Sequence, residues 1–241
     1  DHWATAAVVG PNSRKVVSAI CEGIDFSAEA FPFMASRVGK IGELECRVNR
    51  ISFSGELAYE VNLPANYGRF MWEKLMEAGA KYDITPYGTE TMHVLRAEKG
   101  YVIVGQDTDG SITVDDLGMS WAVSKTKVDF LGKRSLTRPD TARTDRKQLV
   151  GLLTEEPDSV LPEGAQLVND PGAATPVPMV GHVSSSYYSA CCGHSIAMAL
   201  VKDGRRRMGE TVYAPLADGR VLKATITQPL FYDKEGAKSN V

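Results

Sequence analysis

Apolar and polar residues form strand-like and helix-like patterns in turn through the first 100 residues. Strands are predicted at residues 3–11, 43–52 and 58–63. The first is predicted to be a buried strand that ends at Gly10-Pro11. Helices are predicted at residues 13–23, 64–80 and 88–100. Ser13 is the expected N-cap of the first helix, and the apolar stripe of the second includes Met71 and Leu75. These patterns together predict a mixed domain of strands and helices.

The pattern changes near residue 144. Residues 137–147 are polar, charged and proline-containing, as expected of a linker. Short strands are then predicted at residues 148–153, 178–186, 195–201, 210–216 and 220–227. Asp218-Gly219 is a hairpin signal, and regularly spaced short strands are typical of a small barrel or a sandwich. We therefore expect two domains, residues 1–143 and residues 144–241, with no long helix between residues 148 and 228.

Composition excludes several classes of protein. The 241 residues are 43% hydrophobic and carry a formal net charge of −3, so no general attraction to nucleic acid or an anionic membrane is expected. No apolar run approaches the roughly 18–20 residues that a membrane span requires. The four cysteines form no disulfide framework, which favours reduced thiols and a cytoplasmic location. The first residue is Asp rather than Met, so we expect a fragment of a longer chain.

Residues 50–60, RISFSGELAYE, predict a β-hairpin that is a candidate binding site. If residues 54–57 form the turn, Ile51 pairs with Glu60, and Phe53 and Glu60 become diagonal neighbours on one face. A ring beside a carboxylate suits a flat, nitrogen-rich heterocycle, which can stack on the ring and donate N–H bonds to the carboxylate. The simpler interpretation, favoured by the residues alone, is a half-buried hairpin with a solvated glutamate.

Other candidates point to no catalytic or metal site. Cys191 and Cys192 are adjacent and lack the spacing that lets two thiolates reach one zinc ion, so thiols in a turn are expected. Arg205–Arg207 is interpreted as a solvated turn, and His93 as a structural residue of a helix. The motifs of phosphate loops, dinucleotide sites, nucleophile elbows and zinc proteases are absent from the sequence.

The segment RISFSGELAYEVNLPA resembles the R-x-G-Y-T-G-E-x-G-x-E-x-x-x-P segment of the glycine cleavage T-protein, the tetrahydrofolate aminomethyltransferase family. The stretches WEKLMEAGA, LRAEKG, VGQDTDGS, DLGMSWAV and DFLGKRSL follow in that family's order and spacing. YGTETMHVLRAEKGYVIVGQDTDGSIT and PLFYDKEGA are most similar to a subgroup, the alpha subunits of heterotetrameric sarcosine oxidases. The resemblance implies an α+β fold: a folate-binding α/β domain, truncated at its N-terminus, followed by a small all-β barrel.

The resemblance also implies site residues. Glu60 occupies the position of the family's pterin-binding glutamate, Phe53 that of a tyrosine lining the same pocket, and Tyr232 that of a tyrosine closing it. Met92 stands where the family has a folate-contacting arginine, and His93 where it has aspartate. That departure puts the aminomethyltransferase reaction in question, whereas the sarcosine oxidase subgroup shares it.

The function implied is a tetrahydrofolate-binding, one-carbon-transfer module of a cytoplasmic oxidoreductase. It would support oxidative demethylation of sarcosine with formation of 5,10-methylenetetrahydrofolate, although the fragment alone is expected to be inactive in sarcosine oxidation. Flavins and NAD are expected only elsewhere in the full enzyme, and the other subunits are the expected protein partners. The alternatives are a folate-binding domain without one-carbon catalysis and a purely structural domain that packs against subunits.

Overall fold

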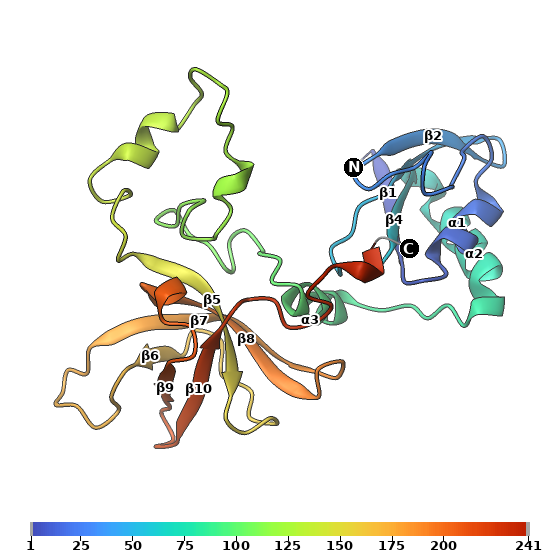
Figure 1. Cartoon of the computed structure of the whole chain (residues 1–241). Coiled ribbons are helices and arrows are strands. Elements are labelled where there is room, and N and C mark those ends of the chain that lie inside the picture. The colour runs from blue at the N-terminus through green and yellow to red at the C-terminus, as the bar shows by residue number, and fades with distance from the viewer. Residues whose placement is uncertain (1, 240–241) are drawn as a thin grey trace. The chain divides into compact units, whose positions relative to one another are not determined.

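The computed structural model describes residues 2–239, which divide into two compact units (Figure 1). The first unit comprises Asp1–Leu95 and Asp233–Val241, and the second comprises Arg96–Tyr232. The chain therefore passes from the first unit to the second and returns to the first at its C-terminal end. The domain boundary expected near residue 144 stays a prediction, because the division into compact units does not test where one sequence domain ends and the next begins.

The first unit is a four-stranded antiparallel sheet with helices packed on one face. Its strands follow the order β1-β4-β3-β2 and are β1 (Trp3–Val9), β2 (Ser36–Ile41), β3 (Leu44–Asn49) and β4 (Ala58–Pro64). The helices on this face are α1 (Ser13–Ile20) and α2 (Gly68–Gly79), and the unit also contains the start of α3 (Thr89–Glu98). Alternate residues of β4, Tyr59, Val61 and Leu63, are 0% exposed and pack with Met71 and Leu75 of α2. The opposite face of the sheet is open.

Several local predictions for this unit need correction. β1 is an edge strand and is largely exposed, with Trp3 at 46%, rather than buried. The N-cap of α1 is Asn12; the Ser13 hydroxyl instead donates to the Leu57 carbonyl at 3.0 Å. β2 was not predicted, because its sequence SRVGKI has too few apolar residues to signal a strand.

The hairpin register also differs from the prediction. Asn49, not Ile51, pairs with Glu60, and residues 50–57 form the connection. The cause lies at Arg50, whose N–H donates to the Ala35 carbonyl and whose carbonyl accepts from the Met34 N–H. Because the backbone of Arg50 bonds to residues 34–35, it does not pair with β4. The β3–β4 pairing therefore ends at Asn49, earlier than in a tight hairpin.

The second unit is built on a closed six-stranded barrel, which decides between the predicted barrel and sandwich. The strand order is β10-β5-β8-β7-β6-β9, and the strands are β5 (Lys147–Thr154), β6 (Gln166–Val168), β7 (Met179–Ser189), β8 (His194–Lys202), β9 (Thr211–Pro215) and β10 (Val221–Thr227). Asp218-Gly219 forms the predicted turn between β9 and β10, with Gly219 at φ +87°. Residues 148–228 are all described, and their only helix is the 3-10 turn Gly204–Arg206, as predicted.

A long irregular stretch joins α3 to the barrel. Its C-terminal part contains the predicted linker, residues 137–147. Arg146 donates to Asp116 at 2.9 Å and to Asp140 at 2.7 Å, and the Leu149 N–H donates to the Asp116 carbonyl at 2.8 Å. The stretch is therefore tied to the first barrel strand at its end, without regular strands of its own.

Candidate functional site

Glu60 lies at the centre of the open sheet face in the first unit. It pairs with Ala7 of β1 on one side and with Asn49 of β3 on the other. The buried residues Tyr59 and Val61 flank it in the strand, so its own side chain points to the opposite, open face. Partial burial between two neighbouring strands raises the pKa of the Glu60 carboxyl through desolvation. A carboxylate here is less well hydrated than one on an ordinary surface.

Several other polar side chains on this face pair with one another. The Thr5 hydroxyl donates to the Asn62 amide oxygen at 2.6 Å, and the Ser36 hydroxyl donates to that of Asn49 at 2.8 Å. The guanidinium of Arg47 lies 5.1 Å from the centre of a Trp3 ring, as a cation–π pair. By contrast, within residues 2–239 no hydrogen bond or ion pair reaches the Glu60 carboxylate. Glu60 therefore keeps its acceptor positions for a ligand that carries N–H donors.

Phe53 belongs to the connection between β3 and β4 and is 40% exposed. The Ser52 hydroxyl shapes this connection by accepting from the Ser54 N–H at 3.3 Å and the Gly55 N–H at 2.9 Å. Gly55 has φ +78°, which glycine adopts without strain. The predicted diagonal pairing of Phe53 with Glu60 is therefore not formed, because Phe53 is not in a strand.

The C-terminal residues of the first unit accept hydrogen bonds from both ends of this connection, residues 50–57. The Leu57 N–H donates to the Lys238 carbonyl at 3.1 Å. Arg50, only 5% exposed, donates to the Phe31 carbonyl at 2.7 Å and to the Ser239 carbonyl at 3.2 Å. Tyr232 belongs to the second unit, where its N–H donates to the Glu98 carbonyl at 3.1 Å, and its predicted folate contact stays a prediction.

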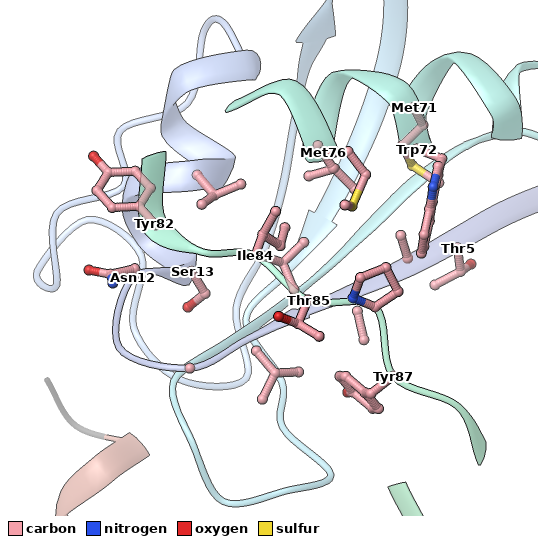
Figure 2. A pocket seen from close by; sticks show the side chains of 18 of the residues that line it. Thr5, Asn12, Ser13, Met71, Trp72, Met76, Tyr82, Ile84, Thr85 and Tyr87 are labelled. Atoms are coloured by element: carbon pink, nitrogen blue, oxygen red, sulfur yellow. The ribbon is translucent and has the colours of Figure 1, made fainter. Parts of the chain in front are cut away.

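A cavity of about 680 Å³ opens beside β1 in the first unit (Figure 2). Its apolar lining includes Met71, Trp72, Leu75, Met76, Ile84 and Tyr87. Met92, predicted from the resemblance to stand where the family has an arginine, also lines it, whereas Glu60 and Phe53 do not. Sequence analysis missed this cavity; the available signal was the position of Phe70 and Trp72, which extend the apolar stripe of α2 beyond Met71 and Leu75.

The second unit contains a buried polar cluster that sequence analysis also missed. Arg96 and Asp107 are both 0% exposed and form an ion pair at 2.5 Å. The hydroxyls of Ser184 and Ser185 each donate to Asp107 at 2.6 Å. Burial of this kind leaves no access for a substrate, so we assign the cluster a structural role, joining the end of α3 to β7.

Neither the thiols nor the acidic residues form a metal site in the described part of the chain, residues 2–239. Cys191 is exposed and Cys192 half-buried, in the turn between β7 and β8. Cys21 and Cys46 are buried in the core of the first unit. Over the same residues, none of the helices has the length and apolar character needed to cross a membrane.

Family models match nearly the whole chain. Residues 1–127 match the GCVT N-terminal domain, and residues 147–233 match the glycine cleavage T-protein C-terminal barrel domain. The chain belongs to the glycine cleavage T-protein family. The predicted family and fold class are thereby confirmed.

Individual relatives refine this assignment. The chain is 49% identical over 241 residues to the sarcosine oxidase subunit alpha of Corynebacterium sp. (strain P-1), covering 99% of this chain and 25% of that one. It is 29% identical over 212 residues to the aminomethyltransferase of Halothermothrix orenii, covering 88% of this chain and 56% of that one. The crystal structure of aminomethyltransferase T from Bartonella henselae has the same fold, with a TM-score of 0.79 at 22% identity over 96% of this chain and 60% of that one. This chain thus spans about a quarter of the length of the sarcosine oxidase relative.

Proposed function

We propose that this chain is a folate-binding module that works within an oxidoreductase of the sarcosine oxidase type. The observation that carries the proposal is Glu60, a partly desolvated carboxylate that no hydrogen-bond donor reaches within residues 2–239, beside the Thr5–Asn62 and Ser36–Asn49 pairs. A reduced pterin presents an amino group and ring N–H groups, which are the donors that this carboxylate lacks. Membership of the T-protein family and the 49% identity to a sarcosine oxidase subunit alpha support the same function.

In this proposal, the chain's own residues bind and orient the folate. Glu60 accepts hydrogen bonds from the pterin, and Phe53 offers an exposed ring for stacking. Tyr232 is a third proposed folate contact, assigned from the family resemblance alone. When bound, tetrahydrofolate supplies the nitrogen atoms that accept a one-carbon unit. Holding those nitrogens in a fixed position accelerates transfer by reducing the entropy that the encounter would otherwise lose. No residue of the chain is assigned proton transfer or nucleophilic attack.

The wider reaction proposed is oxidative demethylation of sarcosine, with 5,10-methylenetetrahydrofolate as a product. Sarcosine oxidation requires a flavin, which we place outside these 241 residues, together with any NAD site. Other subunits of the oxidase are the proposed protein partners. The similarity to both sarcosine oxidase subunit alpha and aminomethyltransferase supports placing folate binding in this chain and sarcosine oxidation elsewhere in the oxidase.

One observation favours a second function, folate binding without one-carbon transfer. Met92 stands where the family has a folate-contacting arginine, and it lines an apolar cavity. A methionine cannot supply the charge of that arginine, so the folate is held by fewer polar contacts. The product of the intact oxidase distinguishes the two: formation of methylenetetrahydrofolate supports the first function, and free formaldehyde alone supports the second.

The test of folate binding is calorimetric titration of the 241-residue chain with tetrahydrofolate. Glu60→Gln keeps the side-chain size but turns one acceptor into a donor that faces a donor. Charge-assisted hydrogen bonds contribute roughly 1.5–3 kcal/mol, so the dissociation constant should rise by about 10–100-fold. Glu45→Gln is the matched control, because Glu45 lies on the same open face of β3 but is exposed.

Two results would contradict the proposal. One is the absence of saturable tetrahydrofolate binding by the unmodified chain. The other is an equal loss of affinity in the Glu60→Gln and Glu45→Gln variants, which would make the effect one of surface charge rather than of a specific contact.

A further inference from the structure

Cys21 and Cys46 are two buried cysteines of the first unit. Cys21 directly follows α1 as its C-cap, with its N–H bonded to the Val17 carbonyl at 3.1 Å, and Cys46 lies within β3. Both side chains belong to the core between the helices and the sheet, where Cys21 is 6% exposed and Cys46 is 0% exposed. The proposed folate contacts use neither thiol, so this pair of nucleophilic groups has no role in the function proposed above.

The fold brings these two cysteines together through β2. The Glu22 N–H donates to the Lys40 carbonyl at 2.8 Å, and the Lys40 N–H donates to the Glu22 carbonyl at 3.0 Å, so the chain directly after Cys21 pairs with β2. Gly39, the residue of β2 before Lys40, pairs with Cys46. A Cβ added to Gly39 would lie 2.4 Å from the Glu22 carbonyl oxygen, so glycine is required for residue 22 to lie this close to β2.

The two thiols are in contact. The Cys21 S–H donates a hydrogen bond to the Cys46 sulfur, and this bond together with burial raises the pKa of Cys21. The same hydrogen bond lowers the pKa of Cys46, so Cys46 is the better thiolate of the two. Over residues 2–239 no third histidine, cysteine or carboxylate joins them, and two thiols alone are too few for a tetrahedral zinc site.

We propose that Cys21 and Cys46 are a redox modification site, which closes reversibly into a disulfide by exchange with a small disulfide of the glutathione type. Cys21 is the entry point, because helix ends open more readily than the interior of a sheet. It forms a mixed disulfide and releases one reduced glutathione, and the Cys46 thiolate then attacks the Cys21 sulfur and displaces the second. The two cysteines lose two electrons and two protons, which the two released glutathione thiols take up.

The disulfide closes a loop that contains residues 22–45. Apart from the bridge at Glu22, residues 22–35 of this loop contain no helix and no strand. Cross-linking the ends of such a loop removes conformational freedom from the unfolded chain, and it also restrains the loop in the folded chain. The oxidised form should therefore be the more resistant to heat, with slower amide hydrogen exchange in residues 22–35 than in the reduced form.

Mass spectrometry of the 241-residue chain carrying Cys191→Ser and Cys192→Ser tests this proposal. These substitutions remove the two thiols outside the core and leave Cys21 and Cys46 in place. The folded chain is equilibrated in oxidised or reduced glutathione, then unfolded and labelled with maleimide. In oxidised glutathione we expect both labelling sites to be lost together, a peptide that links Cys21 to Cys46, and an unfolding midpoint several degrees higher than in reduced glutathione. Reduction should restore both sites.

Cys46→Ala in the same background is the matched control, because it keeps Cys21 and removes its partner. It should form at most a mixed disulfide with glutathione and show no rise in the unfolding midpoint. The linked peptide is measured on the chain with both core cysteines, so that result does not depend on whether the control folds. Two free thiols that persist in oxidised glutathione, glutathione retained on Cys21 despite Cys46, or linkage that forms only in denaturant would overturn the proposal.

Discussion

Replacing Asp107 with asparagine should leave a buried guanidinium without its counter-charge in the second unit. Arg96 is 0% exposed and donates to Asp107 at 2.5 Å and to the Tyr101 carbonyl at 3.0 Å. Asp107 also accepts from the Ile103 N–H at 2.8 Å and from the hydroxyl of Ser185 at 2.6 Å. Asparagine fits the same space, so the substitution changes charge and hydrogen-bonding capacity without creating a cavity.

The magnitude follows from the burial of both partners. Removing one partner of a buried ion pair costs about 3–5 kcal/mol, since the remaining charge stays desolvated. With a urea dependence of about 1–3 kcal/mol/M, the unfolding midpoint of the second unit should fall by more than 1 M. Arg96→Met combined with Asp107→Asn should lose less stability than the two single changes added together, because the double variant has no uncompensated buried charge.

The assay is equilibrium urea unfolding followed by hydrogen exchange of β7 and β8 peptides, which reports on the second unit separately from the first. Asp145→Asn is the control, because Asp145 pairs with Arg143 at 2.9 Å on an exposed surface. That control should leave the unfolding midpoint nearly unchanged. Equal midpoints for the Asp107→Asn and Asp145→Asn variants would refute the argument that the buried pair stabilises the unit.

Three further predictions concern backbone strain, thiols and pH. Gly100→Ala should lower the free energy of unfolding, measured by thermal unfolding, by more than about 1 kcal/mol, because Gly100 has φ +68° and an added Cβ would lie 1.6 Å from the Pro229 carbonyl oxygen. Gly193→Ala is the control in the same assay. Gly193 has φ +60° but no atom near an added Cβ, so its loss of stability reports backbone strain without the steric clash. Cys191 should react with maleimide in the folded chain, while the buried thiols of the first unit should react only after unfolding, as mass spectrometry of the peptides would detect. Tetrahydrofolate affinity should fall on acidification as the Glu60 carboxylate takes up a proton, at a higher pH than for an ordinary glutamate because its pKa is raised; titrations across pH should show no such fall in Glu60→Gln.

Sequence pattern was sufficient for most elements and insufficient where long-range pairing decides the structure. The strands of the barrel were predictable because short apolar runs alternate with turn residues such as Asp218-Gly219. β2 was not, because it gains its place from pairing with β3 and from Gly39, where an added Cβ would lie 2.4 Å from the Glu22 carbonyl oxygen. The exposure of β1 was also not predictable, since an apolar run does not indicate which strand lies at a sheet edge.

The candidate site divides in the same way. Family resemblance selected Glu60, and the structure adds its partial desolvation and its lack of a donor, which depend on the neighbouring strands. The cavity beside β1 and the Arg96–Asp107 pair were not predictable, because each joins segments far apart in the chain. A charged residue in the middle of a helix pattern does not reveal whether its partner is water or a buried carboxylate.

The hairpin explains why a wrong register still left Glu60 on the face that was expected to be functional. The prediction paired Glu60 with Ile51, whereas the structure pairs it with Asn49, a shift of two residues. Side chains alternate with a period of two along a strand, so a shift of two exchanges the neighbour and keeps the face. Glu60 therefore remains on the open side, opposite the buried Tyr59 and Val61. Phe53 does not keep its predicted place in this way, because the two-residue shift leaves it in the connection between β3 and β4 rather than in a paired strand. Any stacking role of Phe53 therefore depends on the conformation of that connection, which Ser52 shapes.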